Sequence, residues 1–441
     1  MAALRRGVSA LLTALALYSL WRRARAGLVA RGALAMGALL ALRALWQRAR
    51  RGNRVTFKAD SALTTRIVGR LSGVLHEYRA PVWLCGGLLQ TASTEVLPVP
   101  QLALRRERVE LPRLQTEADH TTCSPKDVPA GVVSLDWLDV EREDAPIALI
   151  VPGLTGDSGS GYVRRVAREL HDKHGFRVAC YNPRGRGGNE VAAPFLYSVG
   201  WTGDLRRVVR RIRDKYPRAR LMAAGFSLGS NYLAKYVGEE GEQCELSAAV
   251  CLACPVDCLM ISVQLESTLL GRLMDPVLVR SVQALRRQLE HLLKEDPRYD
   301  LAAAEAAKTM HEFDGAVIAP MFEFSSASAY YRWSSAGLFL DQIRVPTLFL
   351  HAENDPIVAS KTIKMDDFSR SPYLISVMTR EGGHSMDWPL ASLRPWSAEV
   401  IGRFFHAAAH ELPVRACASS AAGTAAPVAP ARPAPGRADR I

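Results

Sequence analysis

A serine between two glycines lies near the middle of the chain, in Gly225-Phe-Ser-Leu-Gly229, after a short apolar run and before a stretch of helical character. A Gly-x-Ser-x-Gly pattern in that setting forms a turn so tight that the outer positions hold little more than a hydrogen atom. The Ser227 hydroxyl would then stand clear of the backbone at a helix N-terminus, where amides favour developing negative charge. Short patterns recur by chance, and the glycines also suit an ordinary turn, so the prediction of a nucleophile depends on finding its partners.

The partners of a serine nucleophile are a base within hydrogen-bond reach and a carboxylate that orients this base. In folds with a strand-turn-helix nucleophile, the three residues follow one another as Ser, Asp or Glu, and His, each after the end of a strand. Asp355 follows an apolar run at 345–351, and His384 follows another at 373–378, next to two glycines. We therefore predict Ser227 as nucleophile, Asp355 as orienting acid and His384 as base.

Other residues compete for these roles. His351 ends an apolar run and could be the base, although a packed side chain is expected there. Asp257 follows the strand after Ser227 and is the alternative acid. Glu353 and Asp387 also lie near suitable positions, where solvated side chains are expected. Chain order and placement at strand ends favour Asp355 and His384.

Catalysis by an attacking serine also needs hydrogen-bond donors for the oxyanion of the tetrahedral intermediate. The backbone N–H of Leu228, directly after the nucleophile, is one expected donor. The turn Val151-Pro-Gly-Leu-Thr-Gly156 follows an earlier strand, and we expect the second donor to be the N–H of Leu154. The glycine-rich run at 182–188 lacks the Lys-Ser/Thr ending of a phosphate-binding loop, so a tight turn is the better interpretation.

Apolar runs and helical patterns alternate from about residue 131. Strands buried on both faces and separated by helices predict a doubly wound, mostly parallel sheet of the α/β class. The alternation stops at 256–335, where residues 278–294 and 301–313 have helical spacing, which predicts a small helical insertion over the sheet. The strands are expected at 132–138, 147–152, 177–182, 247–254, 345–351 and 373–378, and the main helices at 162–174, 203–215 and 396–410.

The chain of 441 residues is long enough for one large domain with tails or for two small domains. We divide it into a basic, hydrophobic segment at 1–59 and a proline-punctuated extension at 60–130, which is expected to pack on the core. The catalytic domain is expected at 131–411, and a Pro- and Ala-rich tail at 412–441 is expected to be disordered.

The N-terminal segment carries the net charge of +12, because residues 1–59 hold twelve Lys or Arg and no acidic residue. Two apolar runs at 7–21 and 32–42 are bounded by arginines, and neither reaches the ~20 residues of a membrane-spanning helix. A membrane anchor or a pair of interfacial helices on anionic lipid is the favoured interpretation. A plastid or mitochondrial transit peptide fits the composition but expects more serine, and a secretory signal is disfavoured by Arg22 and Arg23.

The rest of the chain balances 44 basic against 44 acidic residues, and no basic patch with interleaved aromatics indicates nucleic-acid binding. Eight cysteines lie mostly in apolar runs and suggest no disulfide framework, which favours a reducing compartment. Cys251, Cys254 and Cys258 could be metal ligands by spacing, but the run around them is typical of a buried strand, and no second ligand pair follows. No metal or cofactor is predicted.

Several segments together resemble one group of the α/β-hydrolases, which includes plant embryogenesis-associated esterase-like proteins and animal membrane-anchored abhydrolase-domain phospholipases. The resemblance implies the α/β-hydrolase fold, with Ser227, Asp355 and His384 as the catalytic residues. It also implies a single-pass anchor, as in many animal members, or plastid targeting, as in some plant ones. The matching segments lie within residues 80–410 and include 151–156, 181–185, 204–212, 225–229 with Asn231, 236–240, 330–332 and 382–384.

Two stretches depart from the pattern of the group. Leu88 stands where relatives often have His, in an Asn-Gly-His-Leu-Gln-Thr motif that here reads Gly86-Gly-Leu-Leu-Gln-Thr91. Met386 lies in Ser385-Met-Asp387, where relatives often have Gly-Phe. Both departures could alter the pocket, so the substrate of a relative does not transfer directly.

The sequence thus predicts a serine hydrolase that cleaves carboxylic esters, with lipid esters as the expected substrate class. Acyl transfer to an alcohol or thiol would use the same residues, and a catalytically silent hydrolase fold used for binding is a third possibility. The oligomeric state is left open.

Overall fold

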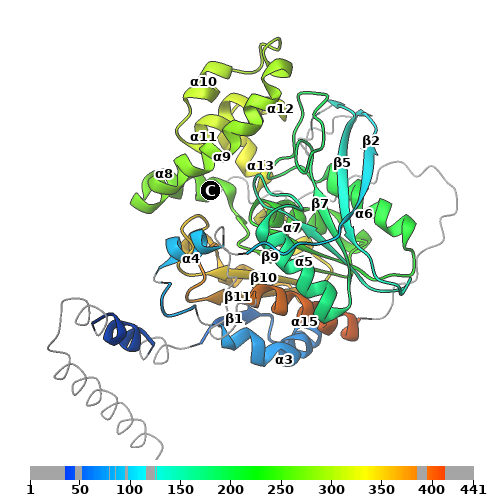
Figure 1. Cartoon of the computed structure of the whole chain (residues 1–441), viewed down its shortest axis with the longest axis vertical. Helices are drawn as coiled ribbons and strands as arrows, with labels where there is room; N and C mark the ends of the chain where they lie inside the picture. Colours follow the sequence, from blue (N-terminus) through cyan, green and yellow to red (C-terminus); the bar gives the residue numbers. More distant parts are fainter. Residues whose placement is uncertain are drawn as a thin grey trace, which may run out of the picture.

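The computed structural model describes residues 35–44, 52–78, 80–84, 86–94, 98–115, 125, 127–384 and 395–412. Figure 1 shows a central sheet with helices on both faces and a separate group of helices above the sheet edge. The short helix at 35–44 lies beside this body.

The central sheet has nine strands in the order β1-β11-β10-β9-β8-β6-β7-β5-β2. The six inner strands from β11 to β7 run parallel, whereas β1, β5 and β2 pair in antiparallel fashion at the two edges. β3 and β4 form a separate two-stranded sheet. The strands are β1 (Arg54–Phe57), β2 (Arg105–Leu111), β3 (Leu114–Gln115), β4 (Asp127–Val128), β5 (Gly131–Leu138), β6 (Ile147–Val151), β7 (Arg177–Asn182), β8 (Leu221–Phe226), β9 (Ala248–Leu252), β10 (Thr347–Ala352) and β11 (Leu374–Thr379).

Side chains of the inner strands alternate between two hydrophobic clusters, one on each face. In β6, Leu149 belongs to one cluster and Ile150 to the other, as the period of two in a strand requires. The helices α3 (Ala62–Glu77), α5 (Gly161–His174) and α15 (Trp396–Glu411) cover one face. The other face is covered by α6 (Gly203–Lys215), α7 (Leu228–Glu240) and α14 (Met365–Phe368).

The helical insertion forms a cap with its own hydrophobic cluster, which includes Leu285, Leu289, Phe313 and Tyr330. Chain from the loop before α6, including Phe195 and Trp201, contributes to the same cluster, so the cap is fixed to the domain below it. The cap comprises α8 (Cys258–Ser267), α9 (Leu269–Leu293), α10 (Leu301–Ala306), α11 (Met310–Phe313), the π-helix η2 (Asp314–Ile318), α12 (Ala319–Met321) and α13 (Ala327–Ser334).

The predicted parallel sheet and the helical insertion are confirmed, and α6 has the predicted bounds. The helix expected at 278–294 is part of the longer α9, because Thr268 caps an earlier start. The single helix expected at 301–313 is wrong, because the segment forms two helices. α10 ends at Ala306, and Thr309 caps the start of α11 in a capping box with Glu312.

The boundaries at 59 and 130 do not coincide with structural breaks. β1, which lies before residue 59, pairs with β11, and β2, which lies before 130, pairs with β5. The sequence offered little periodicity there, because a four-residue edge strand and a strand rich in arginine lack a continuous apolar run. We therefore propose that the hydrolase domain begins near residue 52.

No helix within the described part of the chain is both long and apolar enough to cross a membrane. The apolar run at 7–21, the cleavage sites of a transit or signal peptide, and most of the Pro- and Ala-rich tail lie outside the described residues. The helix at 35–44 falls within the second predicted apolar run.

Candidate active site

Ser227 occupies a strained turn between β8 and α7, the two elements predicted to hold it. Its backbone has φ 51° and ψ −121°, a conformation that L residues rarely adopt. A Cβ added to Gly225 would lie 2.7 Å from the Cα of Ser230, and one added to Gly229 would lie 2.1 Å from the carbonyl oxygen of Pro152. Both glycines are therefore required sterically, and the turn holds the Ser227 side chain at the carboxyl edge of the sheet.

The structure brings the three predicted residues together. The Oγ of Ser227 lies 2.8 Å from Nε2 of His384, and Nδ1 of His384 lies 2.9 Å from Oδ2 of Asp355. Asp355 is buried and also accepts hydrogen bonds from the backbone N–H groups of Ile357 and Val358. Because the carboxylate can only accept here, Nδ1 of His384 carries a proton and Nε2 is free to accept one from Ser227.

The competing residues have other positions. Asp257 caps α8 by accepting from the backbone N–H of Met260. His351 is buried next to Phe349 in β10, and burial lowers its pKa to about 4, which makes it an unprotonated packing residue at neutral pH. Glu353 forms a half-exposed ion pair with Arg380, and Asp387 lies outside the described residues.

The loop after β6 and the start of α7 present the two predicted oxyanion donors. The N–H of Gly153 donates to Tyr162 Oη, and the N–H of Thr155 donates to Tyr197 Oη, both at 2.8 Å. Between them, no described group accepts from the N–H of Leu154, and the same holds for Leu228 at the first position of α7. These two amides are thus available to a developing oxyanion, while their neighbours fix the loop.

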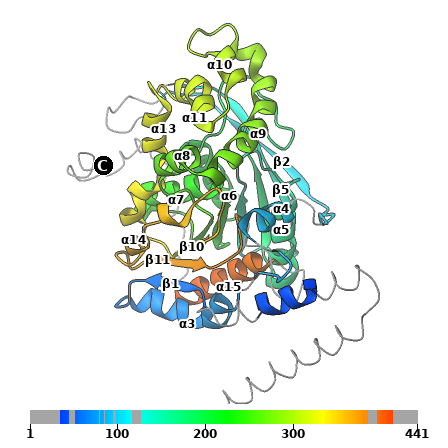
Figure 2. The ribbon, with the colours of Figure 1, turned by 90° about the vertical axis from the view of Figure 1, so that its left-hand side faces the viewer.

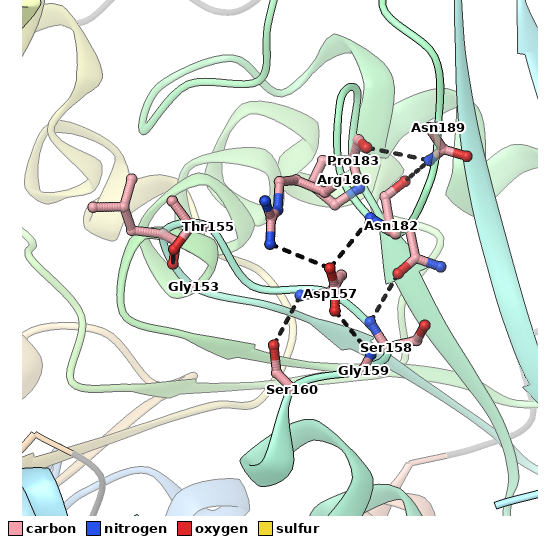
Figure 3. Close-up of polar contacts among 12 residues, drawn as sticks. Gly153, Thr155, Asp157, Ser158, Gly159, Ser160, Asn182, Pro183, Arg186 and Asn189 are labelled. Atoms are coloured by element: carbon pink, nitrogen blue, oxygen red, sulfur yellow. Dashed lines mark hydrogen bonds and ion pairs between the residues drawn. The ribbon is translucent and has the colours of Figure 1, made fainter. Parts of the chain in front are cut away.

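The loop after β6, residues 152–160, is called the oxyanion loop below. Asp157 in this loop connects it to the turn after β7 (Figure 3). Its carboxylate accepts from Gly159 N at 2.8 Å, from Gly187 N at 3.3 Å and from Arg186 Nη2 at 3.2 Å. The glycine-rich run that the sequence analysis interpreted as a tight turn therefore supplies two donors to the oxyanion loop. The positive φ of Thr155, at 56°, lies within the segment braced in this way.

A buried carboxylate on β5 braces the same loop from below. Asp136 accepts hydrogen bonds from Ser158 Oγ, from Asn182 Nδ2, and from Nε and Nη2 of Arg106. Burial raises the pKa of this carboxyl, but the hydrogen bonds from Arg106, Ser158 and Asn182 outweigh burial and lower the pKa overall. A cavity of about 550 Å³ lies beside this network, between Asp136, Asp157 and the loop before β2.

Two functional residues that the sequence analysis did not single out belong to α4 (Gly87–Ser93). Thr91 Oγ1 accepts from the backbone N–H of His384 at 2.9 Å. Gln90 Oε1 accepts from Gly382 N and from Asn354 Nδ2, each at 2.8 Å. Helix α4 therefore holds the loops that carry the base and the acid. The signal was available, because Gln90 and Thr91 are the part of the resembling motif that does not depart.

The two departures from the family pattern have different outcomes. Leu88 is exposed on α4, on the side of the helix away from the buried Gln90. Met386 lies outside the described residues. Leu88 therefore changes the surface next to the site and leaves the hydrogen bonds of Gln90 and Thr91 intact.

The cap reaches the oxyanion donors. Leu154 and Leu228 are partly buried and pack against the hydrophobic cluster of the cap. A substrate carbonyl at their amides would therefore have apolar side chains beside it, which suits an acyl chain.

Potential metal ligands cluster away from these loops. Among the residues that the structure describes, Glu169 and His174 of α5 and Glu399 of α15 bring ligand atoms within 4.8 Å of one another. Cys251, Cys254 and Cys258 are buried, and burial raises the pKa of each thiol, to about 12 for Cys258. This shift disfavours the thiolate form that binds zinc.

A mostly parallel sheet whose central strand leads through a strained Gly-x-Ser-x-Gly turn into a helix defines the α/β-hydrolase class. Residues 146–385 match the family profile described as the alpha/beta hydrolase fold, and the chain belongs to this family.

Named relatives cover the same region. The chain is 32% identical over 281 residues to a monoacylglycerol lipase of Saccharomyces cerevisiae, covering 63% of this chain and 62% of the yeast protein. It is 31% identical over 281 residues to the embryogenesis-associated protein EMB8 of Picea glauca, covering 61% of each. It is 30% identical over 266 residues to the phospholipase ABHD3 of Mus musculus, covering 59% of this chain and 64% of the mouse protein. The matches thus span slightly less than two thirds of the length of these relatives.

Proposed function

We propose that this protein is a serine hydrolase that cleaves carboxylic esters. The observation that carries the proposal is the chain of contacts from Ser227 Oγ through His384 to the buried Asp355, at 2.8 and 2.9 Å. The strained turn at Ser227 supports it, because such strain persists where function requires it. A fold used only for binding would need neither the aligned imidazole nor the paired free amides.

In the proposed mechanism His384 Nε2 takes the proton of Ser227 as Oγ attacks the ester carbonyl carbon. The oxyanion accepts hydrogen bonds from the N–H groups of Leu154 and Leu228. The imidazolium, stabilised by Asp355, then protonates the leaving alcohol as the C–O bond breaks and the acyl-enzyme forms. Water, deprotonated by His384, attacks the acyl-enzyme and releases the acid and Ser227. None of these steps requires a metal or a cofactor.

The proposed substrates are lipid or phospholipid acyl esters. The apolar cap cluster next to Leu154 and Leu228 supports this class, and so do the printed names of two relatives, a lipase and a phospholipase. We also propose that the part of residues 1–59 that precedes β1 holds the protein at a membrane, the alternative being a cleaved organellar transit peptide. Carbonate extraction of cell membranes tests the anchor: a chain that is washed off completely, or that has lost its N-terminus, contradicts it.

The test of the proposed function is labelling with a fluorophosphonate probe, alongside hydrolysis of a water-soluble short-chain ester. Ser227→Ala should lose labelling and reduce ester hydrolysis by on the order of 10⁴ or more, and His384→Ala should do nearly the same. Ser72→Ala is the matched control, because this serine lies exposed on α3 and should react like wild type.

Each other result points to a different function. A wild-type chain that takes up no probe and cleaves no ester would support a silent binding protein. A labelled enzyme that forms a new ester when an alcohol is supplied would be an acyltransferase, which product analysis detects.

A further inference from the structure

Exposed apolar side chains are concentrated on one side of the molecule. Of the thirteen large hydrophobic side chains that are exposed in the described residues, eleven lie on the helix at 35–44, on α4 and the loop before it, or on α8 and α9. The other two are Val99 and Leu338. Single exposed apolar residues are ordinary on a protein surface, but a set gathered on neighbouring elements marks an interaction surface.

The first half of α9 and the preceding α8 contribute the largest share. Leu269, Leu273 and Val277 recur every four residues, so they form one stripe along α9, and Leu269 is 80% exposed. Met260 and Val263, three residues apart on α8, are also exposed. Beyond this stripe, Leu285 and Leu289 in the second half of α9 pack into the cap cluster, and Met274 packs against the core below, so the helix does not depend on covering the stripe.

Helix α4 and the helix at 35–44 continue the surface toward the catalytic loops. Figures 1 and 2 both show these two helices on the same side of the molecule as α8 and the start of α9. Leu88 and Leu89 are exposed on α4, and Trp83 in the loop before it is 59% exposed. The helix at 35–44 is attached here by Arg43, which donates to Glu381, three residues before His384, and to the carbonyl of Leu84.

The charge pattern indicates what covers this surface. α4 has no charged residue, and the single charged residue of the helix at 35–44, Arg43, is paired with Glu381. The 34 residues that lead into the helix at 35–44 contain six arginines and no acid, and Arg272 and Arg280 are exposed beside the apolar stripe on α9. Glu266, at the end of α8, is an exposed acid on this surface. An apolar surface whose charged neighbours are mostly arginines matches a bilayer that contains anionic headgroups.

We propose that the exposed residues of α8, α9, α4 and the helix at 35–44 form a membrane-docking surface that brings the catalytic loops next to the bilayer. The inference rests on the proposed lipid-ester hydrolysis and extends it, because the substrate would enter from the membrane without passing through water. The N-terminal segment brings the chain to the membrane, and the docking surface sets the orientation of the domain there.

The test compares two substrates in the full-length chain. L269S/L273S/V277S replaces three exposed side chains, so thermal unfolding should match wild type. Hydrolysis of a water-soluble short-chain ester should stay within about twofold, whereas hydrolysis of a fluorogenic phospholipid in phosphatidylcholine–phosphatidylserine vesicles should fall by about tenfold or more. Equal losses on both substrates, or none on vesicles, would overturn the docking surface. A wild-type chain that hydrolyses neither substrate would instead contradict the proposed function.

Leu338→Ser is the matched control. Leu338 is exposed to the same extent as Val277 but lies on η3 (Ala336–Gln342), which packs against α7. This variant should keep the vesicle activity of wild type. Arg272→Glu/Arg280→Glu should reduce vesicle hydrolysis when phosphatidylserine is present and leave it unchanged on pure phosphatidylcholine.

A measurement without catalysis separates docking from activity. Brominated lipid in the vesicles should quench part of the tryptophan fluorescence. Because Trp21 and Trp46 of the N-terminal segment can also be quenched, the quenched part should become smaller in Trp83→Phe, by the contribution of Trp83. A Trp83 signal that is not quenched contradicts the proposal.

A surface that instead joins two copies would give a wild-type dimer and a monomeric triple variant in sedimentation, with vesicle hydrolysis unchanged, and this result would also overturn it.

Discussion

The nucleophile and the base of the candidate site are held in position by different physical means. Ser227 sits in a turn whose neighbours belong to β8, α7 and the loop after β6, and it is fixed by close backbone contacts at Gly225 and Gly229. His384 lies on a loop after β11 and is fixed by hydrogen bonds, one of which its backbone N–H donates to Thr91, 293 residues earlier in the chain. The nucleophile half of the site is therefore held mainly by steric contacts. The base half is held by long-range hydrogen bonds and also by close backbone contacts at Gly87 and Gly383.

This difference sets how each half responds to change. Atoms that overlap at 2.1 Å cannot be relieved by a small adjustment, because the obstacle is backbone. A missing hydrogen bond can be replaced in part by water, or the loop can shift by a fraction of an ångström. We therefore expect a disturbance of the close packing at the nucleophile to abolish activity abruptly, and the loss of a hydrogen bond in the base half to reduce activity by degrees.

The largest effect is expected for Gly229→Ala. The new methyl would meet the carbonyl oxygens of Pro152 and Val151, which pushes the turn away from the oxyanion loop. Hydrolysis of a soluble ester should fall by more than about 10³, because both the nucleophile and its donors move. Overpacking of this kind should also reduce the stability by about 1–3 kcal/mol, which urea unfolding measures.

Gly69→Ala is the control for this change. Gly69 lies inside α3, and nothing stands within 4 Å of the position of an added Cβ. The substitution should leave activity unchanged and stabilise the chain by about 0.5–1 kcal/mol. Equal activity of both variants would show that close packing does not hold the nucleophile.

The sequence could predict nearly all of the turn that holds Ser227. Of the base half, it could predict only the acid and the base themselves. Glycines at 225 and 229 encode the turn within a five-residue motif, although the backbone that Gly229 approaches belongs to Pro152 in the loop after β6. Apolar runs encode strands that are buried on both faces. Asp355 and His384 were predictable from chain order. Gln90 and Thr91 were not assigned a role, because a hydrogen bond across the fold leaves no periodicity at either end. β1 and β2 were missed for a related reason, since edge strands need only one apolar face.

The base half can be tested with Gln90→Leu and Thr91→Val. Each substitution removes a side-chain oxygen of α4 that accepts hydrogen bonds from the loops of Asn354, Gly382 and His384. The side-chain volume stays similar. We expect kcat to fall by roughly 10–100-fold with little change in KM, because a displaced imidazole affects chemistry more than binding. Fluorophosphonate labelling should slow in parallel.

A loss as complete as that of His384→Ala would contradict the graded behaviour. Ser93→Ala is a suitable control, because this side chain lies on the same helix and its hydroxyl donates to the carbonyl oxygen of Gln90 within that helix. This variant should retain nearly full activity.

Asp157 allows a test of the oxyanion loop, which packs against the turn that holds Ser227. Asp157→Asn keeps an acceptor for Gly159 but removes the charge that faces Arg186. The pair is partly exposed, so its contribution is modest, and kcat on the soluble ester should fall by about threefold to tenfold. Arg186→Gln should act through the same pair, so the double variant should be no worse than the single ones. Fully additive losses would show that the two residues act independently.

The smallest effect on activity is expected at His351, although it lies close to Asp355 and His384. Its pKa is lowered by burial to about 4, from an ordinary value of 6.5, so the folded chain holds it neutral. Between pH 6.5 and 4 the unfolded chain binds a proton there and the folded chain does not, so stability falls as the pH is lowered through this window, by up to about 3 kcal/mol.

His351→Phe keeps a ring beside Phe349 and removes this pH-dependent loss of stability. The free energy of unfolding of the variant should therefore exceed that of wild type by an amount that grows from pH 6.5 to 4, while ester hydrolysis at pH 7 stays within about twofold. A large loss of hydrolysis at neutral pH would place His351 in the base half, as a residue that positions Asp355, and this half of the site would then extend into β10.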